Sequence, residues 1–457
     1  MDISKFTIEG SQPIIKALTK IEANHKGFLI VESDKKVIGT ITDGDIRRHL
    51  LKNSSLDLQI NKIINKEFKF INEDTPYEHI YKLLDNDIKF IPNLDNQGRL
   101  INFITKENIP ERQEVETYHR SKSPVRISFG GGGSDLTNYF IKNNGIVVNA
   151  TISLYTHSSL IKRTDQKIKI NSHDLNQEII YESYHDLQKS DNNKFELINS
   201  LIKTIKPKYG FELYIQSDYP IGTGLGGSAT VLSSIIGCFN QLRIDKWTNY
   251  EIAEIAFEAE RLCMNVSGGW QDQYATVFGG FNFMEFSNEE NIIHSLKISN
   301  QNIANLEENL VLCYTNTRHE SGEIHSDQKK KILEIDVESI VKKNVDLTYK
   351  IKNALLKGPN KSFGVLLDKA WNYKKKFSEH ITNSNLDNIY KEALENGAIG
   401  GKLLGAGGGG YFLFYVPFEK RNNLLIWMEN RGLKYTPFRF ESEGLLSWSS
   451  RLENNPK

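Results

Sequence analysis

The chain has 457 residues, which is enough for two or three domains that each bury a core of their own. Its 57 basic and 57 acidic side chains balance, so the composition predicts neither a nucleic acid nor an anionic membrane as a partner. Three scattered cysteines without a Cys-x-x-Cys pair, no signal peptide at the start and no apolar run approaching about 18 residues predict a cytoplasmic protein with reduced thiols.

Residues 1–112 contain an internal repeat. Residues 28–42 alternate as two short strands around a polar turn, and a helix is predicted to begin at Asp43. A similar pattern recurs at 89–109, and each copy follows a helical segment, at 14–22 and at 76–84. Two β-α-β-β-α units that each leave a face uncovered would pair to close one core.

The repeat resembles a pair of CBS domains, and the string Gly-Thr-Ile-Thr-Asp-Gly-Asp at 39–45 carries the resemblance. The family implies that Thr42 and Asp45 hold the ribose of an adenine nucleotide or a nucleotide sugar. The second copy has Thr105 and Asn108 at the matching positions, so one acid is lost and we expect at most one nucleotide site per chain. A pair that serves only as the scaffold of a homodimer is the open alternative.

Residues 111–122 are polar and lack an apolar period, so we interpret 113–122 as a linker between domains. The second domain then opens with an alternating strand at 123–129, followed by four glycines and the pair Ser134-Asp135. Glycine lets the backbone approach a ligand, and Asp135 can accept hydrogen bonds from the hydroxyls of a sugar. An ordinary strand–turn–helix is the alternative interpretation.

The stretch 220–230 holds four glycines and continues into an apolar pattern with helical spacing that reaches Leu242. Such a loop is a site for an anion, because unpaired N–H groups and the helix dipole both favour negative charge. We therefore predict a phosphate-binding loop in which the Ser228 hydroxyl can face a phosphate-bound Mg²⁺. The loop is not a Walker A motif, since no Gly-Lys-Ser/Thr follows.

Two later segments carry acidic residues. The amphipathic helix predicted over 250–262 places Glu258 and Glu260 on different faces, so at most one of them can serve a site. The string Gly-Gly-Trp-Gln-Asp-Gln at 268–273 sets Asp272 between two amides in a glycine-flanked turn. A carboxylate there can take a proton from an attacking hydroxyl, or act on the charge of a transferred phosphoryl group.

Over about residues 123–447 the chain resembles the GHMP small-molecule kinases, with their three motifs in order and in the form of the heptose-kinase branch. The motifs match 126–135, 220–229 and the glycine-rich stretch 397–410. The resemblance implies ATP as the phosphoryl donor, Mg²⁺ held by Ser228 and Glu260, and Asp272 as the catalytic residue. The predicted ATP-binding residues are Pro220, Gly222, Gly224, Leu225, Gly226, Gly227, Ser228 and Ala229.

The same resemblance implies an acceptor site for a sugar phosphate. The predicted substrate-binding residues are Arg126, Gly132, Gly133, Ser134, Asp135, Arg318, Lys374, Gly407 and Gly408. Arg318 and Lys374 are the cations expected at the phosphate of the acceptor, because that phosphate needs a cationic pocket apart from the ATP site. A solvated basic face is the alternative for both segments.

The implied fold is α+β: a GHMP kinase fold of two subdomains, about 123–300 and 301–457, preceded by the CBS pair at 1–112. The implied reaction moves the γ-phosphoryl group of ATP to the anomeric hydroxyl of D-glycero-D-manno-heptose 7-phosphate. The resulting 1,7-bisphosphate would serve the synthesis of nucleotide-activated heptose and surface polysaccharide. Two alternatives are a kinase for an unphosphorylated sugar such as fucose, and a nucleotide-sensing adaptor without catalysis.

Overall fold

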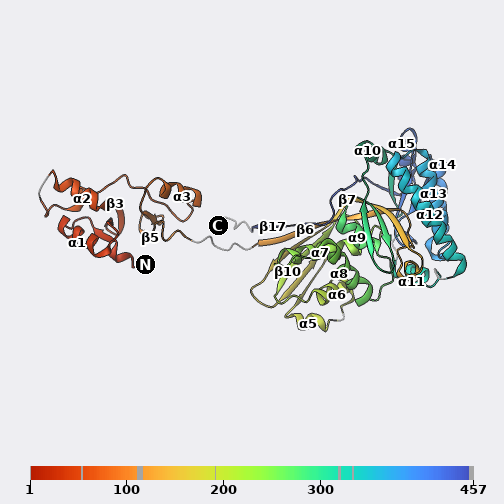
Figure 1. The fold of residues 1–457 in the computed structure, drawn as a ribbon, viewed down its shortest axis with the longest axis horizontal. Helices are drawn as coiled ribbons and strands as arrows, with labels where there is room; N and C mark the ends of the chain where they lie inside the picture. Colours follow the sequence, from red (N-terminus) through yellow and green to blue (C-terminus); the bar gives the residue numbers. More distant parts are fainter. Residues whose placement is uncertain are drawn as a thin grey trace. The chain divides into compact units, whose positions relative to one another are not determined.

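The computed structural model describes residues 2–52, 55–110, 117–190, 192–317, 321–331 and 334–451. The chain forms two compact units, residues 1–114 and 115–457, and each mixes helices and strands (Figure 1). None of the described helices has the length and apolarity that a bilayer crossing requires.

The N-terminal unit contains a three-stranded sheet in the order β1-β2-β3 and a separate hairpin, β4-β5. Its elements are β1 (Thr7–Glu9), α1 (Ile14–Asn24), β2 (Phe28–Ser33), β3 (Lys36–Thr42), α2 (Asp43–Leu50), α3 (Tyr77–Asp85), β4 (Ile91–Leu94) and β5 (Leu100–Ile104). A buried cluster of phenylalanines joins the two parts, and the rings of Phe28 and Phe90 stack 3.6 Å apart.

The two halves of this unit share one strand arrangement. β1 pairs in parallel with β2, where Ile8 faces Val31, and Ile71 makes a parallel bridge with Asn93 of β4. Each hairpin also has a register shift immediately after the equivalent residue, Val31 in the first and Asn93 in the second. The internal repeat expected from the sequence is therefore present in the strands.

The second half departs from the expected repeat at its last helix. Residues 105–109 form a turn, whereas the first copy continues into α2. Pro110 follows directly, and a proline disfavours the helical region for the residue before it. The Asn108 amide also donates to the carbonyl of Phe103, which ties the turn back to β5.

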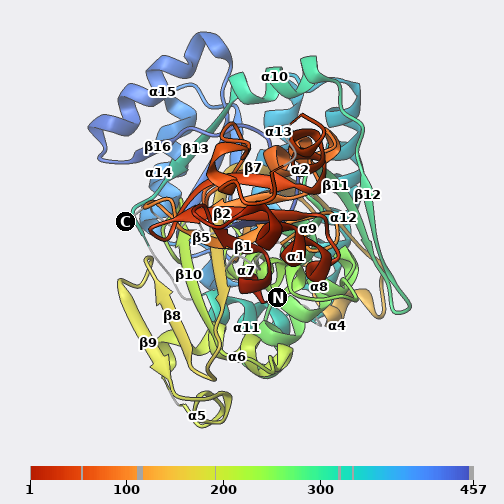
Figure 2. The ribbon, with the colours of Figure 1, turned by 90° about the vertical axis from the view of Figure 1, so that its left-hand side faces the viewer.

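The larger unit is built around an eight-stranded sheet. β7 is its longest strand and pairs with β6 along one side, while its first half pairs with β11 and its second half with β10 along the other. The strands are β6 (Thr117–Gly130), β7 (Gly145–Lys162), β8 (Ile168–Ser172), β9 (Gln177–Tyr181), β10 (Phe211–Ser217), β11 (Phe281–Phe286), β12 (Asn291–Ser295) and β17 (Leu446–Arg451). Figure 2 shows β8, β9 and α5 together at one end of this sheet.

Helices that join these strands carry much of the core. They are α4 (Thr137–Phe140), α5 (Tyr184–Gln188), α6 (Glu196–Ile205), α7 (Gly227–Gln241), α8 (Asn249–Phe257), a π-helix (Glu258–Cys263) and α9 (Gln271–Phe278). α7 is buried almost throughout and packs on β6 and β7. This helix thus fixes the glycine-rich loop, which precedes it, to the middle of the sheet.

A second sheet, in the order β14-β15-β13-β16, completes the larger unit. Its strands are β13 (Leu310–Tyr314), β14 (Gly400–Leu403), β15 (Tyr411–Tyr415) and β16 (Lys434–Thr436). The accompanying helices are α10 (Asn300–Asn309), α11 (Ser321–Lys331), α12 (Ile335–Lys357), α13 (Lys361–Lys374), α14 (Ser384–Glu395) and α15 (Phe418–Asn430). β14 connects to β15 through the glycine-rich stretch of the third motif.

Two predicted boundaries differ from the structure. Residues 117–122 of the predicted linker are the first part of β6, and they pair with β17. This half of the strand is polar because it faces α7 with small hydroxyl side chains, such as Ser121, which donates to the Ser234 carbonyl. The predicted C-terminal subdomain also returns to the first sheet, since Phe440 bridges to Ile152 before β17 begins.

Candidate active site

The glycine-rich loop before α7 forms one wall of a cavity. Gly222, Gly224 and Gly226 have φ values of 74°, 77° and 80°, in the left-handed region that glycine adopts without strain. Gly226 is the N-cap of α7 and has no side chain to cap it, so the first N–H groups of the helix are left for a ligand. The predicted residues that line this wall are Gly222, Gly224, Gly226, Gly227, Ser228 and Ala229. We refer to this space as the loop cavity.

The other two predicted ATP-binding residues support the loop from behind. Leu225 is buried, and its carbonyl accepts from the backbone N–H of Arg126 at 3.1 Å. The carbonyl of Pro220 accepts from the Thr223 hydroxyl at 3.1 Å. Away from the glycines, the loop cavity is lined by apolar side chains that suit the base of a nucleotide: Leu175, Leu197 and Ile198.

The glycine-rich stretch after β14 packs directly on this loop. A Cβ atom at Gly405 would lie 2.3 Å from Cα of Gly224, and one at Gly410 would lie 2.3 Å from the carbonyl oxygen of Thr223. No side chain fits at such distances, so the close approach requires glycine at both positions. Gly405 and Ala406 also line the loop cavity.

Gly407 and Gly408, which we predicted at the substrate, lie one step further along this stretch. The Gly408 N–H donates to the carbonyl of Ile381 at 2.8 Å, and a Cβ atom at Gly407 would lie 2.7 Å from Cα of Ile381. These two glycines therefore anchor the stretch to the segment before α14, while Gly405 is the glycine that reaches the cavities.

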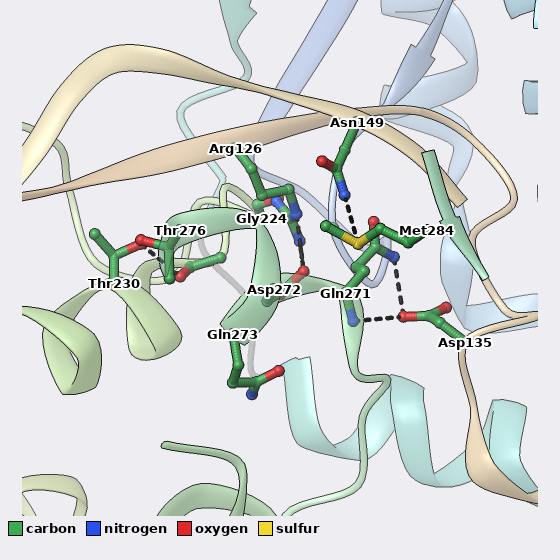
Figure 3. Close-up of polar contacts among 12 residues, drawn as sticks. Arg126, Asp135, Asn149, Gly224, Thr230, Gln271, Asp272, Gln273, Thr276 and Met284 are labelled. Carbon is green, nitrogen blue, oxygen red and sulfur yellow. Dashed lines mark hydrogen bonds and ion pairs between the residues drawn. The ribbon is translucent and has the colours of Figure 1, made fainter. Parts of the chain in front are cut away.

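Asp272 lies where the loop cavity meets a second, smaller cavity. It stands in the first turn of α9, and its Oδ1 accepts from Nε of Arg126 at 2.8 Å and lies 2.7 Å from Nη2 (Figure 3). Arg126 comes from β6 and donates from Nη1 to the carbonyl of Gly224 at 2.7 Å. The guanidinium thus joins the predicted catalytic carboxylate to the phosphate loop. The smaller cavity, which we call the inner cavity, shares Arg126, Asp272, Arg261 and Gly405 with the loop cavity.

Asp135 is buried on the wall of the inner cavity. Its carboxylate accepts from the backbone N–H of Gly133 at 3.1 Å and of Gln271 at 3.4 Å, and from the Gln271 amide at 3.1 Å (Figure 3). Burial and the nearby Asp272 raise the pKa of Asp135. Gly269 makes room for it, since a Cβ atom there would lie 1.9 Å from Oδ2. Three donors therefore fix the orientation of this carboxylate at the wall of the inner cavity.

Glu260 lies in the π-helix and lines the loop cavity beside Ser228. Its Oε2 accepts from the Gln273 amide at 2.8 Å and lies 3.4 Å from Nη2 of Arg261. Burial raises the pKa of Glu260, although Arg261 opposes the rise and Ser228 forms a hydrogen bond that also opposes it. Glu258 is exposed, so Glu260 is the acid of this helix that lines the loop cavity.

The inner cavity contains functional groups that the sequence did not single out. Lys402 of β14 is buried there, and so are the side-chain amides of Gln271, Gln328 and Asn344. Arg261 reaches both cavities. A charged residue within a buried strand, as in Gly-Gly-Lys-Leu at 400–403, is a signal that could have revealed Lys402.

The remaining predicted substrate residues fall into three groups. Gly132, Gly133 and Lys374 line the inner cavity. Ser134 is buried, and its hydroxyl donates to the carbonyls of Gly131 and Ile146, so it shapes the loop. Arg318 lies outside the described residues.

In the N-terminal unit, the predicted nucleotide residues bind each other. Thr42 is the N-cap of α2. Its backbone N–H and its hydroxyl both donate to Oδ2 of Asp45, at 2.8 Å and 2.7 Å. Asn108 receives the same two bonds from Thr105 in the second half. The pair thus makes a capping box in the first copy and closes a turn in the second.

Comparison with known families places three domains on the chain. The GHMP kinases N terminal domain matches residues 196–280, and the GHMP kinases C terminal domain matches residues 351–424. A CBS domain matches residues 1–52. The α+β class and the kinase fold expected from the sequence are confirmed, and so is a CBS domain at the N-terminus.

Individual relatives match about two thirds or more of the chain. D-glycero-alpha-D-manno-heptose 7-phosphate kinase of Campylobacter jejuni is 38% identical over 343 residues, which cover 72% of this chain and 98% of the relative. The crystal structure of a D-glycero-D-manno-heptose 1-phosphate kinase from Bacteroides thetaiotaomicron matches with a TM-score of 0.60 and 29% identity, over 72% of this chain and 98% of that one. A bifunctional fucokinase/GDP-fucose pyrophosphorylase of Arabidopsis thaliana is 25% identical, over 66% of this chain and 30% of the relative.

Proposed function

Since the chain belongs to the GHMP kinase family and is an ATP-dependent sugar kinase of the heptose phosphate type, we propose a specific reaction for it. The γ-phosphoryl group of ATP is transferred to the anomeric hydroxyl of D-glycero-D-manno-heptose 7-phosphate, which gives the 1,7-bisphosphate and ADP. The product would serve the synthesis of nucleotide-activated heptose for surface polysaccharide. Two of the relatives described above are named for a heptose phosphate, which supports this acceptor.

The observation that carries the proposal is the position of Asp272, which lines both cavities. With ATP in the loop cavity and the sugar in the inner cavity, its carboxylate is next to the attacking hydroxyl. Asp272 takes the hydroxyl proton as the new O–P bond forms and the bond between the γ-phosphorus and the β,γ-bridging oxygen breaks. Arg126 holds the carboxylate through Nε and places a fixed positive charge beside the transferred group.

The acceptor would be oriented by Asp135 and its neighbours. The Asp135 carboxylate can accept from sugar hydroxyls, and the buried acceptor atoms Ser128 Oγ, Gln271 Oε1 and Asn344 Oδ1 have no hydrogen-bond partner among the described residues. All three residues line the inner cavity. A polyhydroxylated ligand would supply the missing donors, which supports a sugar as the acceptor.

Mg²⁺ would be held by Ser228 and Glu260. The fit rests on Glu260, a buried carboxyl at the loop cavity, and on the neighbouring Gln273 Oε1, a buried atom with no hydrogen-bond partner in the described part of the chain. Among the described residues no group of three or more His, Cys, Asp or Glu side chains could hold a metal, which suits an ion bound by one or two protein ligands together with phosphates. When bound, Mg²⁺ would neutralise phosphate charge.

Exchanging Ser228→Ala should raise the KM for Mg²⁺-ATP; an unchanged KM and Mg²⁺ dependence would remove Ser228 as a ligand.

The test of the reaction is a coupled assay of ADP release over free sugars and sugar phosphates, with Asp272→Asn as the matched inactive control. We expect turnover with heptose 7-phosphate above all other acceptors, and a product phosphorylated at carbon 1 by NMR. Equal or faster turnover of free fucose would favour the unphosphorylated acceptor. No turnover with any sugar would favour the nucleotide-sensing adaptor, which the joint presence of Ser228, Glu260 and Asp272 opposes.

A further inference from the structure

Two lysines line the inner cavity, Lys374 partly buried and Lys402 buried, and they differ in their partners. Lys374, at the end of α13, donates from Nζ to the carbonyls of Leu403 at 2.8 Å and Gly405 at 2.5 Å. The Lys402 residue is only 4% exposed and lines the inner cavity, yet no described residue accepts a hydrogen bond from its Nζ or brings a carboxylate within 4.0 Å of it. An ammonium in so enclosed a place normally has at least one such partner, so its Nζ is left to bind an anion in the cavity.

The charges around the inner cavity also favour the binding of an anion. The side chains that line it include four cations, Arg126, Arg261, Lys374 and Lys402, and two carboxylates. Asp272 pairs with Arg126, and Asp135 is already bonded to three N–H donors. Arg261 is near Glu260 of the loop cavity. With both lysines protonated, the form that a bound anion favours, the cavity has more positive than negative side chains.

The location of Lys402 indicates which phosphate it could bind, that of the nucleotide or that of the acceptor. Lys402 lines the inner cavity and is absent from the lining of the loop cavity, where the glycine-rich loop lies. A phosphate of the nucleotide would sit at the N-terminus of α7, whereas an anion at Lys402 would belong to the acceptor.

We propose that Lys402 binds the phosphate group of a phosphorylated sugar acceptor, and that it is the residue by which the site prefers a sugar phosphate to a free sugar. This inference rests on the proposed function. Lys374 has a different role: it is a positioning residue that holds the backbone at 403–405 against the phosphate loop.

The main test compares heptose 7-phosphate with unphosphorylated heptose, using the full chain at saturating Mg²⁺-ATP. Exchanging Lys402→Met keeps most of the unbranched side chain and removes its charge. We expect the preference for the phosphorylated acceptor, as a ratio of kcat/KM values, to fall about 10²-fold through KM, because a charge-assisted contact in a buried site is lost. Lys402→Arg should keep most of the preference. Lys374→Met is the matched control, and it should lower kcat/KM for both acceptors by the same factor.

Two results would overturn the assignment. An equal loss with both acceptors in Lys402→Met would mean that Lys402 only supports the site, and a raised KM for ATP would mean that it serves the nucleotide. A second measurement does not depend on turnover. With ADP saturating, inorganic phosphate should raise the Tm of the wild type more than that of Lys402→Met. If the wild type phosphorylated neither heptose, the proposed function would fail, and equal thermal shifts would overturn the anion site itself.

Discussion

Arg126 connects the chemistry of the site to the backbone that surrounds it. One guanidinium contacts the Asp272 carboxylate and the Gly224 carbonyl, and the backbone N–H of the same residue donates to Leu225. The side chain is 4% exposed, so its charge is compensated mainly by Asp272. A buried ion pair of this kind is sensitive to the loss of one partner but tolerates a change that keeps the hydrogen bonds.

Asp272→Asn tests the role of the carboxylate with little change of shape. The amide oxygen can still accept from Arg126, but it cannot take a proton from the acceptor. We expect kcat to fall by about 10²–10⁴, the usual contribution of a positioned acid–base group. The Kd for ATP, measured by calorimetry, should stay close to that of the wild type. Near wild-type turnover would remove Asp272 from the mechanism.

The pH dependence of KM follows from Lys402. Burial and the facing Arg126 lower the pKa of Lys402 to about 7, with Asp135 opposing the shift, and Lys374 also faces it. A bound phosphate dianion favours the ammonium and raises this pKa again. Binding is therefore strongest below the pKa of the free site, and the KM for heptose 7-phosphate should rise as the pH increases from about 7 to 9.

The matched variant for this prediction is Lys402→Arg, because a guanidinium stays charged throughout the range. Its KM should be flat where that of the wild type rises. In the wild type, the KM for unphosphorylated heptose should not show the rise with pH that we expect for heptose 7-phosphate. A KM for heptose 7-phosphate that stays constant between about pH 7 and 9 in the wild type would contradict the prediction.

At the scale of elements, the site is made by loops that approach more closely than side chains allow. The loop before α7 and the stretch after β14 meet at Gly224 and Gly405, while the turn before α9 meets Asp135 at Gly269. Each contact joins segments far apart in the sequence. Glycines at these points therefore determine the relative positions of the ATP-binding and acceptor-binding elements.

Gly269→Ala should damage the acceptor side selectively. Its Cβ atom would lie 1.9 Å from Oδ2 of Asp135, so the carboxylate or the turn must move. Since a displacement of about 1 Å can cost about 10²-fold, we expect a loss of that order in kcat/KM for the sugar, with the Kd for ATP unchanged. Ser267→Ala in the same turn is the control. Wild-type kinetics in Gly269→Ala would show that the Asp135 contact does not position the acceptor.

The sequence predicted those elements whose signal is local. The phosphate loop, the Asp272 turn and the Asp135 loop are each short strings in which glycines and one polar residue stand together. The sequence analysis did not identify Lys402 and Arg261, because their position at a cavity depends on neighbours from other segments. An isolated lysine or arginine in a sequence usually marks a solvated surface. Gly407 and Gly408 were placed at the substrate because glycine strings do not reveal which member reaches the cavity.

The start of the larger unit was predicted wrongly for a related reason. Residues 117–122 of β6 look like a linker, because the residue that they bury is Ser121, whose hydroxyl contacts a serine-containing helix, and not an apolar one. In the N-terminal unit, the strand repeat was visible from alternation, whereas the missing last helix depended on Pro110 and the turn closed by Asn108.

At the scale of the whole molecule, the first prediction concerns the boundary between the units. The match to the Campylobacter jejuni relative covers 98% of that protein but 72% of this chain, so that relative has little length left for a counterpart of the N-terminal unit. We expect the chain 115–457 to keep the kcat and KM of the full chain. The chain 123–457 lacks the residues of β6 that pair with β17, and its Tm should be several degrees lower. Equal Tm values for the two would contradict the role assigned to this strand pairing.

The last prediction concerns the N-terminal unit, whose CBS domain suggests nucleotide binding. Asp45 completes the capping box of α2 by accepting from Thr42, and Asn108 keeps the same acceptor geometry in the second half without the charge. Asp45→Asn should therefore preserve the fold while it removes the carboxylate that a ribose would need. Calorimetric titration of the full chain with AMP and GDP-sugars should show at most one site per chain besides the kinase site, and this site should weaken in Asp45→Asn. Two such sites would contradict the expected loss of a site at Asn108, and a single site that is equally strong in the variant would rule out Asp45 as the ribose ligand. If no heat were released and the chain 115–457 kept its activity, the unit would be a scaffold.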